Sequence, residues 1–138
     1  MRIGMLFGML YNSLANRFNK DMDEIGLTSS QSYVMGYLIH NEGREINQKD
    51  IEEALRLMNP TVTGILNRLE KKGFIIRRKS ESDKRYKIVE ITEKGRLIKD
   101  KMAEKAVAAN TALFSGVSES ELAAFEKTLR KLMKNVME

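Results

Sequence analysis

The sequence predicts a mainly α-helical protein with one small β-hairpin, an α+β fold. Three observations support this prediction. Apolar residues recur at helical spacing through most of the 138 residues, and a single proline, Pro60, leaves the long segments uninterrupted. Two runs rich in Ile, Val and aromatic residues, 74–79 and 86–91, flank six polar residues, which is typical of a hairpin. No linker-like stretch divides the chain, so we expect one unit over 1–138.

The two ends of the chain predict helices that contact a second subunit. In residues 2–25 apolar side chains repeat in steps of three or four, and the stripe is wide enough to cover more than one neighbour. The last helix follows a heptad pattern. Packing within one chain is the alternative. We expect dimerisation helices in 1–26 and 96–138. The predicted dimerisation residues are Ile3, Phe7, Leu10, Leu122, Phe125, Leu129, Leu132 and Val136.

Capping patterns predict where three further helices begin. The pairs Thr28–Gln31 and Asn47–Asp50 form capping boxes, in which each side chain satisfies a free backbone N–H. Asn59 is expected to be the N-cap of the next helix, with Pro60 at its first helical position, where a missing N–H costs nothing. Gly73 is expected to end that helix.

Charge is concentrated in one segment. The chain carries a net charge of +5, but the segment 56–87 alone holds ten Lys and Arg against three acidic residues, a local +7. The rest of the chain is therefore slightly acidic. A basic segment of this kind is expected in a protein that binds nucleic acid. The alternative is a solvated charged face.

The helix that begins at Asn59 has two contrasting faces. One face is apolar, whereas the other carries small and hydrogen-bonding groups, with Gly64 allowing close approach. Such a face suits the DNA major groove, where Thr contacts thymine methyl groups and Asn or Arg contact adenine or guanine edges. An ordinary helical hairpin is the alternative to a helix-turn-helix. The predicted DNA-binding residues of this recognition helix are Asn59, Pro60, Thr61, Thr63, Gly64, Asn67, Arg68 and Lys71.

The hairpin that follows predicts a wing, so residues 27–95 are expected to form a winged helix-turn-helix. Arg85 is expected in the minor groove, whose negative potential favours a guanidinium. Asp83 would be repelled by phosphate, and we expect it to hold Arg85 in position. Lys71, Lys72, Arg77, Lys79 and Lys84 are expected to meet phosphates. The predicted DNA-binding residues of the wing are Arg77, Lys79, Ser82, Asp83, Lys84 and Arg85.

Together these residues resemble the MarR (multiple antibiotic resistance regulator) family. The resemblance lies in Leu27-Thr28, Asn59-Pro60-Thr61-Val62-Thr63, Leu66-x-x-Leu69-Glu70-x-x-Gly73, Asp83-x-Arg85 and Ile91-Thr92-Glu93-Lys94-Gly95. It implies a homodimer of winged-helix subunits on double-stranded DNA, bound at a pseudo-palindromic operator. It also implies repression in most members, with activation left open, and often release by a small phenolic or anionic effector.

Two positions depart from the family pattern. Arg56 replaces a frequent turn Gly, and Met58 replaces a frequent capping Ser. The resemblance places an effector pocket between helices 1, 2 and 5 and the base of the wing. If the effector is an anion, Arg17 and Arg85 are its expected partners.

Other function classes find little support. With no Cys and one His, the chain has no disulfide framework and no Cys/His metal cluster. It also has no nucleophile with a His base and no Gly-rich phosphate loop, so we expect no enzyme, no metal and no cofactor. No segment approaches the length needed to span a bilayer, so we expect a cytoplasmic protein that does not bind membranes. A module that binds any duplex without base preference stays as the alternative to a sequence-specific regulator.

Overall fold

The computed structural model describes residues 2–137, which divide into two compact units at the Lys105–Ala106 boundary. The first unit holds α1 (Arg2–Glu24), α2 (Ser29–His40), α3 (Gln48–Leu55), α4 (Asn59–Lys71), β1 (Ile75–Lys79) and β2 (Lys87–Ile91). The helix α5 (Glu93–Leu113) crosses the boundary, and α6 (Glu119–Met137) lies in the second unit. The predicted fold class, mainly α with a small β wing, is confirmed.

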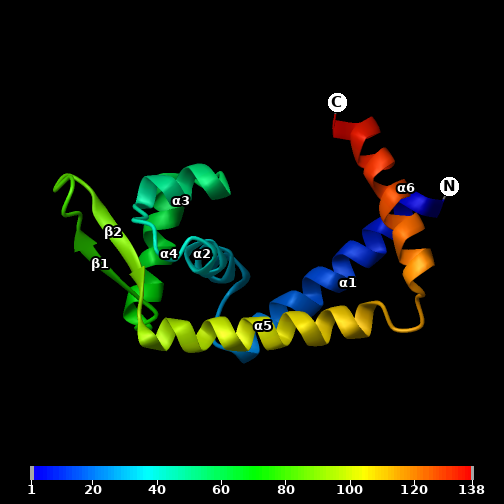
Figure 1. The fold of residues 1–138 in the computed structure, drawn as a ribbon, viewed down its shortest axis with the longest axis horizontal. Helices are drawn as coiled ribbons and strands as arrows, with labels where there is room; N and C mark the ends of the chain where they lie inside the picture. The colour runs from blue at the N-terminus through cyan, green and yellow to red at the C-terminus, as the bar shows by residue number, and fades with distance from the viewer. Residues whose placement is uncertain (1, 138) are drawn as a thin grey trace. The chain divides into compact units, whose positions relative to one another are not determined.

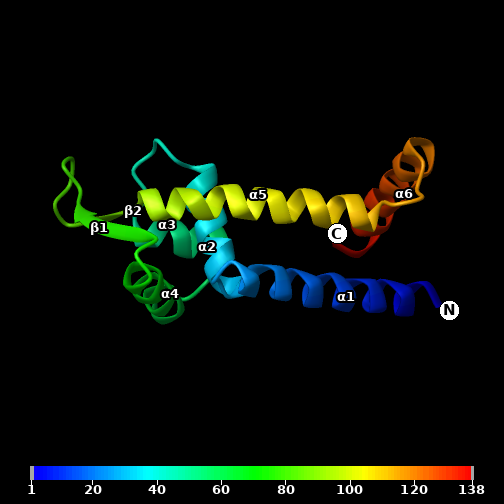
Figure 2. The same cartoon turned by 90° about the horizontal axis from the view of Figure 1, so that it is seen from below.

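The core of the first unit lies where α2, α3 and α4 meet the hairpin. Figure 1 shows these three helices gathered beside β1 and β2, with α1 leading away on the other side, and Figure 2 shows the same arrangement from below. Val34, Ile51, Leu66 and Ile75 contribute side chains that are at most 1% exposed. Burying apolar surface here holds α4 against the hairpin.

The helix starts follow the capping patterns, with one exception. Both predicted capping boxes are present: the Thr28 hydroxyl accepts a hydrogen bond from Gln31 N at 3.1 Å, and the Asn47–Asp50 pair does the same. The predicted N-cap at Asn59 is wrong. Helix α4 begins one residue earlier, because Val62 N donates to the Met58 carbonyl at 3.1 Å. Met58 therefore occupies the N-cap position, and its side chain makes no capping hydrogen bond.

The turn between α3 and α4 has a left-handed residue at Arg56, with φ 53° and ψ 46°. This conformation brings the Cβ of any residue except Gly too close to its own backbone, which explains the preference for Gly at such a position. Arg56 adopts it nonetheless, since its N–H and that of Leu57 both donate to the Glu52 carbonyl.

The wing is an antiparallel pair in which Ile75 lies opposite Ile91 and Lys79 opposite Lys87. The connection between α2 and α3 joins this sheet, because Val89 N donates to the Ile46 carbonyl at 2.7 Å. The base of the wing is fixed to the start of α5, since a Cβ on Gly95 would lie only 2.3 Å from the Phe74 carbonyl oxygen. Backbone contacts thus hold the wing along β2 and at its base.

The second unit consists of the end of α5 and α6. A capping box opens α6, in which Ser118 N donates to Glu121 Oε2 at 2.8 Å and Glu121 N donates to the Ser118 hydroxyl at 3.2 Å. The apolar residues of α6 stay accessible, with Phe125 48% and Val136 82% exposed. No helix within residues 2–137 has the length and apolar character needed to cross a membrane.

Candidate nucleic-acid interface

Helix α4 buries its apolar face and exposes its polar one, as predicted. Val62, Ile65, Leu66 and Leu69 are at most 4% exposed. The opposite side is accessible to solvent, most fully at Pro60, Thr61, Asn67, Arg68 and Lys71. Because Met58 supplies no capping side chain, free backbone N–H groups remain at the start of the helix. Such groups favour an anion such as phosphate.

The start of α4 is joined to α3 by a side chain that sequence analysis missed. Gln48 Nε2 donates to the Thr63 hydroxyl at 2.8 Å and lies 3.5 Å from the Asn59 carbonyl oxygen. Thr63 is therefore partly turned towards α3 and is only half-buried. Nothing in the sequence marks Gln48, because its partner lies 15 residues away and depends on how the two helices pack.

A cleft of about 540 Å³ lies between the starts of α3 and α4 and the end of the wing loop. Asn59 and Thr63 line it on the helix side, and Arg85 and Tyr86 line it on the wing side. The structure therefore brings the first turn of α4 and the predicted minor-groove arginine to the two sides of one concave surface.

Asp83 holds Arg85 at the tip of the wing, as predicted. Arg85 Nε donates to Asp83 Oδ1 at 3.0 Å, and its Nη2 donates to Oδ2 at 2.8 Å. This hydrogen bonding lowers the pKa of Asp83 and raises the pKa of Arg85. The Arg85 side chain is still 82% exposed, so its guanidinium is oriented and accessible at once.

Glu45, which sequence analysis also missed, holds the base of the wing loop. Its Oε2 accepts hydrogen bonds from the hydroxyls of Ser80 at 3.2 Å and Ser82 at 3.3 Å, and its Oε1 lies 3.6 Å from Arg78 Nη2. Ser80 is buried, and its hydroxyl also accepts from Asp83 N at 3.2 Å. The Ser82 hydroxyl, predicted to face DNA, is thus engaged within the protein.

Two cations predicted to meet phosphates have partners inside the protein instead. Lys72 Nζ donates to the Gly26 carbonyl at 2.8 Å and to Gln31 Oε1 at 2.7 Å. Arg77 forms two hydrogen bonds to Glu70 and one to Asn67. Both side chains occupy positions set by packing between elements, which a count of basic residues does not reveal.

Four predicted cations keep exposed side chains that form no ion pair or hydrogen bond within residues 2–137. Two of them lie on α4 and two on the wing. These residues are Arg68, Lys71, Lys79 and Lys84. Their charges are available to a polyanion.

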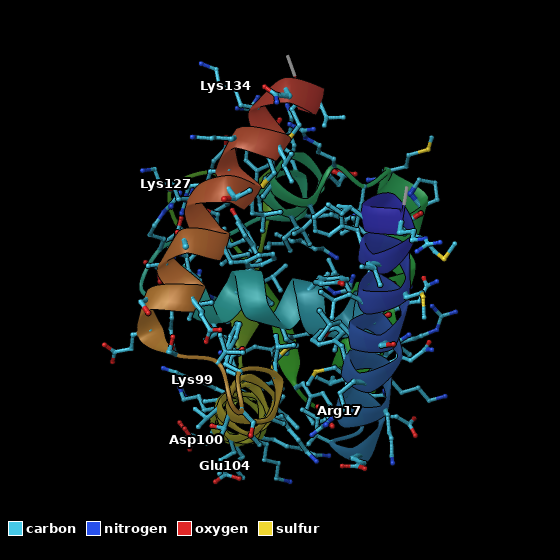
Figure 3. The ribbon with its side chains drawn as sticks, turned by 90° about the vertical axis from the view of Figure 1, so that its right-hand side faces the viewer. Arg17, Lys99, Asp100, Glu104, Lys127 and Lys134 are labelled. Carbon is cyan, nitrogen blue, oxygen red and sulfur yellow. The ribbon has the colours of Figure 1, made fainter. Side chains whose placement is uncertain are left out.

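The two arginines predicted to bind an effector lie apart. Arg17 lies on α1 (Figure 3), with its Nε 3.4 Å from Asp21 Oδ2, whereas Arg85 lies on the wing. A second cavity, of about 310 Å³, lies between the end of α2, β2 and the start of α5, and neither arginine lines it. Residues 2–137 contain no cluster of His, Cys, Asp and Glu suited to a metal ion.

The sequence is similar to those of known transcription regulators. The MarR family model matches residues 28–87. The transcriptional regulator SarZ of Staphylococcus aureus is 30% identical over 102 residues, which cover 74% of this chain and 68% of SarZ. The regulator MhqR of Bacillus subtilis is 24% identical over 132 residues, which cover 96% of this chain and 90% of MhqR.

Solved structures extend the likeness to nearly the whole chain. The transcription regulator MepR of S. aureus superposes with a TM-score of 0.82 at 25% identity, covering 96% of this chain and 97% of MepR. MepR in a complex with DNA superposes with a TM-score of 0.79 at 26% identity, covering 96% of each chain. These relatives are regulators and not enzymes. From its fold, its wing and its likeness to SarZ, this chain belongs to the MarR family of winged-helix transcription regulators.

Proposed function

We propose that this protein binds double-stranded DNA as a sequence-specific transcriptional regulator. One observation carries the proposal: the start of α4, through Asn59 and Thr63, and the oriented guanidinium of Arg85 border the same cleft. In a winged helix, α4 would enter the major groove while the wing contacts the adjacent minor groove. The complex of the similar protein MepR with DNA supports this assignment. A regulator of this kind works in the cytoplasm, where the DNA of a bacterial cell lies.

The roles of the exposed residues follow from their chemistry. Thr61 and Asn67 on α4 carry groups that hydrogen-bond to base edges, and Gly64 lets the helix approach them. Lys79 and Lys84 on the wing neutralise phosphates and give affinity that falls with salt. Residues 27–95 form the part that binds DNA under this proposal.

A homodimer is the proposed form of the protein. Helix α1 buries only Asp21 and Met22 within the first unit, and it exposes Ile3 by 58% and Leu10 by 43%. The apolar stripe of α6 is accessible as well. Apolar surface of this extent is typical of a face covered by a partner. A second copy of the chain would cover it and would place two α4 helices in successive major grooves about 34 Å apart.

A substitution on α6 tests the homodimer. Phe125→Glu puts a charge into the apolar stripe, and we expect it to convert the protein to a monomer in analytical ultracentrifugation. Lys127→Glu is the matched control, because Lys127 is exposed on α6 outside that stripe (Figure 3), and it should leave the dimer intact. A Phe125→Glu protein that stays dimeric would remove α6 from the interface.

We further propose repression that a small phenolic or anionic effector relieves. Bound at an operator, the dimer would block access of the polymerase. An effector could release it only by binding one dimer conformation more tightly than the other. Panels of small phenolic carboxylates, added to the dimer on its operator, test this step. Release at constant salt supports it, and no release by any member of the panel counts against this effector class.

The decisive experiment for DNA binding is a titration with the DNA upstream of this protein's own gene. We expect an inverted repeat there, with half-sites about one helical turn apart, and binding much tighter than to unrelated DNA of equal length. A ratio of affinities near one would favour the alternative, a module that binds any duplex.

A further inference from the structure

Asn67 on the exposed face of α4 is held by an arginine of the wing. Arg77 Nη2 donates to Asn67 Oδ1 at 2.7 Å. The same guanidinium donates to both oxygens of Glu70, through Nε at 3.1 Å and Nη2 at 3.1 Å. Three side chains from two elements therefore form one network at the junction of α4 and β1.

The chemistry of the guanidinium fixes the orientation of the Asn67 amide. Arginine only donates hydrogen bonds, so the amide atom that faces it must be the carbonyl oxygen. An amide turned the other way would place N–H against N–H. The Asn67 carbonyl is thereby drawn towards the wing, and the amide nitrogen, with its two N–H donors, forms the other end of the group.

Arg77 is itself held in place. Its side chain is 21% exposed, and it belongs to β1, where Arg77 lies opposite Val89 in the sheet. Hydrogen bonding to Arg77 lowers the pKa of Glu70, which keeps this carboxylate charged and paired. A bidentate pair of this kind adds geometric restraint as well as energy. The orientation of the Asn67 amide thus depends on the sheet and not on α4 alone.

The bases of DNA differ in the hydrogen-bond donors and acceptors that they present to an amide side chain. Adenine presents one acceptor and one donor in the major groove, so an Asn that binds it in two places must use both its carbonyl and its amide nitrogen. Guanine presents two acceptors, N7 and O6. An amide that offers two N–H donors and whose carbonyl is already engaged matches guanine better than adenine.

We propose that Arg77 sets the base preference of Asn67, so that Asn67 donates to guanine and disfavours adenine at one position of each half-site. The inference rests on the proposed function, since it requires α4 in the major groove. Arg77 acts here as a positioning residue, in place of the phosphate contact expected from the sequence.

The test is selection from random DNA by the dimeric protein and its variants. We expect the wild type to recover a motif with guanine over adenine at one position per half-site, by roughly 5- to 100-fold, the discrimination of one good base contact. In Arg77→Met the amide is free to turn, so this ratio should fall several-fold while the rest of the motif persists. Lys79→Met removes one charge from the same strand without touching the network, and it should lower affinity while leaving every base preference unchanged.

Asn67→Asp gives a second, independent arm. Aspartate keeps an acceptor for Arg77 and removes both donors, so the guanine preference should disappear even if Arg77→Met fails to fold. An unchanged motif in either folded variant would overturn the inference while leaving DNA binding intact. A wild type that recovers no motif would instead overturn the proposed function, and the inference with it.

Discussion

Replacing Gly64 with alanine should raise the stability of the protein and lower its affinity for DNA. In the interior of α4 an alanine loses less backbone entropy on folding than a glycine, a gain of about 0.5–1 kcal/mol. The new Cβ would meet only Arg68 Nη1, at 3.5 Å, which is an ordinary contact. No strain therefore offsets the gain, and the midpoint of thermal unfolding should rise by roughly 2–6 °C.

The effect on DNA binding has the opposite sign. A methyl group on the exposed face would hold α4 away from the base edges and remove at least one direct contact, worth about 1–3 kcal/mol. Operator affinity should therefore fall by about 5-fold or more. Fluorescence anisotropy at fixed salt measures this affinity, and calorimetry measures the unfolding midpoint.

Gly36→Ala is the matched control. Gly36 lies within α2, and a Cβ there would meet no atom within 4 Å. The same gain in stability is expected, without a change in operator affinity. If Gly64→Ala binds the operator as tightly as the wild type, Gly64 does not face the DNA closely, and the groove assignment of α4 fails.

Three further outcomes follow from particular contacts. Arg85→Ala should weaken operator binding at least about 10-fold, because it removes one charged contact in the minor groove. It should not lower the unfolding midpoint, because the side chain is 82% exposed. Equal affinity of the variant and the wild type in a gel-shift titration would contradict the role of the wing. Glu70→Gln should be less stable than the wild type at neutral pH. Pairing with Arg77 lowers the pKa of Glu70 below its ordinary 4.5, so the pair stabilises the fold above that pH. The difference in stability between the wild type and Glu70→Gln should therefore shrink as the pH falls through the lowered pKa. Urea unfolding at several pH values measures this difference, with Glu53→Gln as a control. Gly95→Ala should lower the free energy of unfolding by about 1–3 kcal/mol, because the Cβ of the alanine would lie only 2.3 Å from the Phe74 carbonyl oxygen. A variant as stable as the wild type would refute that close approach.

The order and type of the elements could be predicted because local physics sets them. The Thr28–Gln31 box forms within one turn, and the apolar face of α4 follows from spacing alone. Asp83 and Arg85 are two residues apart, so their pairing could also be predicted from the sequence. The one local error concerned the N-cap of α4, which is Met58 and not the predicted Asn59, so the helix begins one residue earlier than expected.

The sequence by itself therefore determined the fold and the exposed face of α4, whereas tertiary structure decided which basic residues remain available to a ligand. Lys72 and Arg77 look like other cations of the basic segment, yet their partners come from elsewhere in the fold, Gln31 for Lys72 and Glu70 for Arg77. Glu45 likewise meets Ser80 across 35 residues. Such contacts depend on how the connection before α3 packs against the sheet and how β1 packs on α4. That packing cannot be predicted from the spacing of residues along the chain.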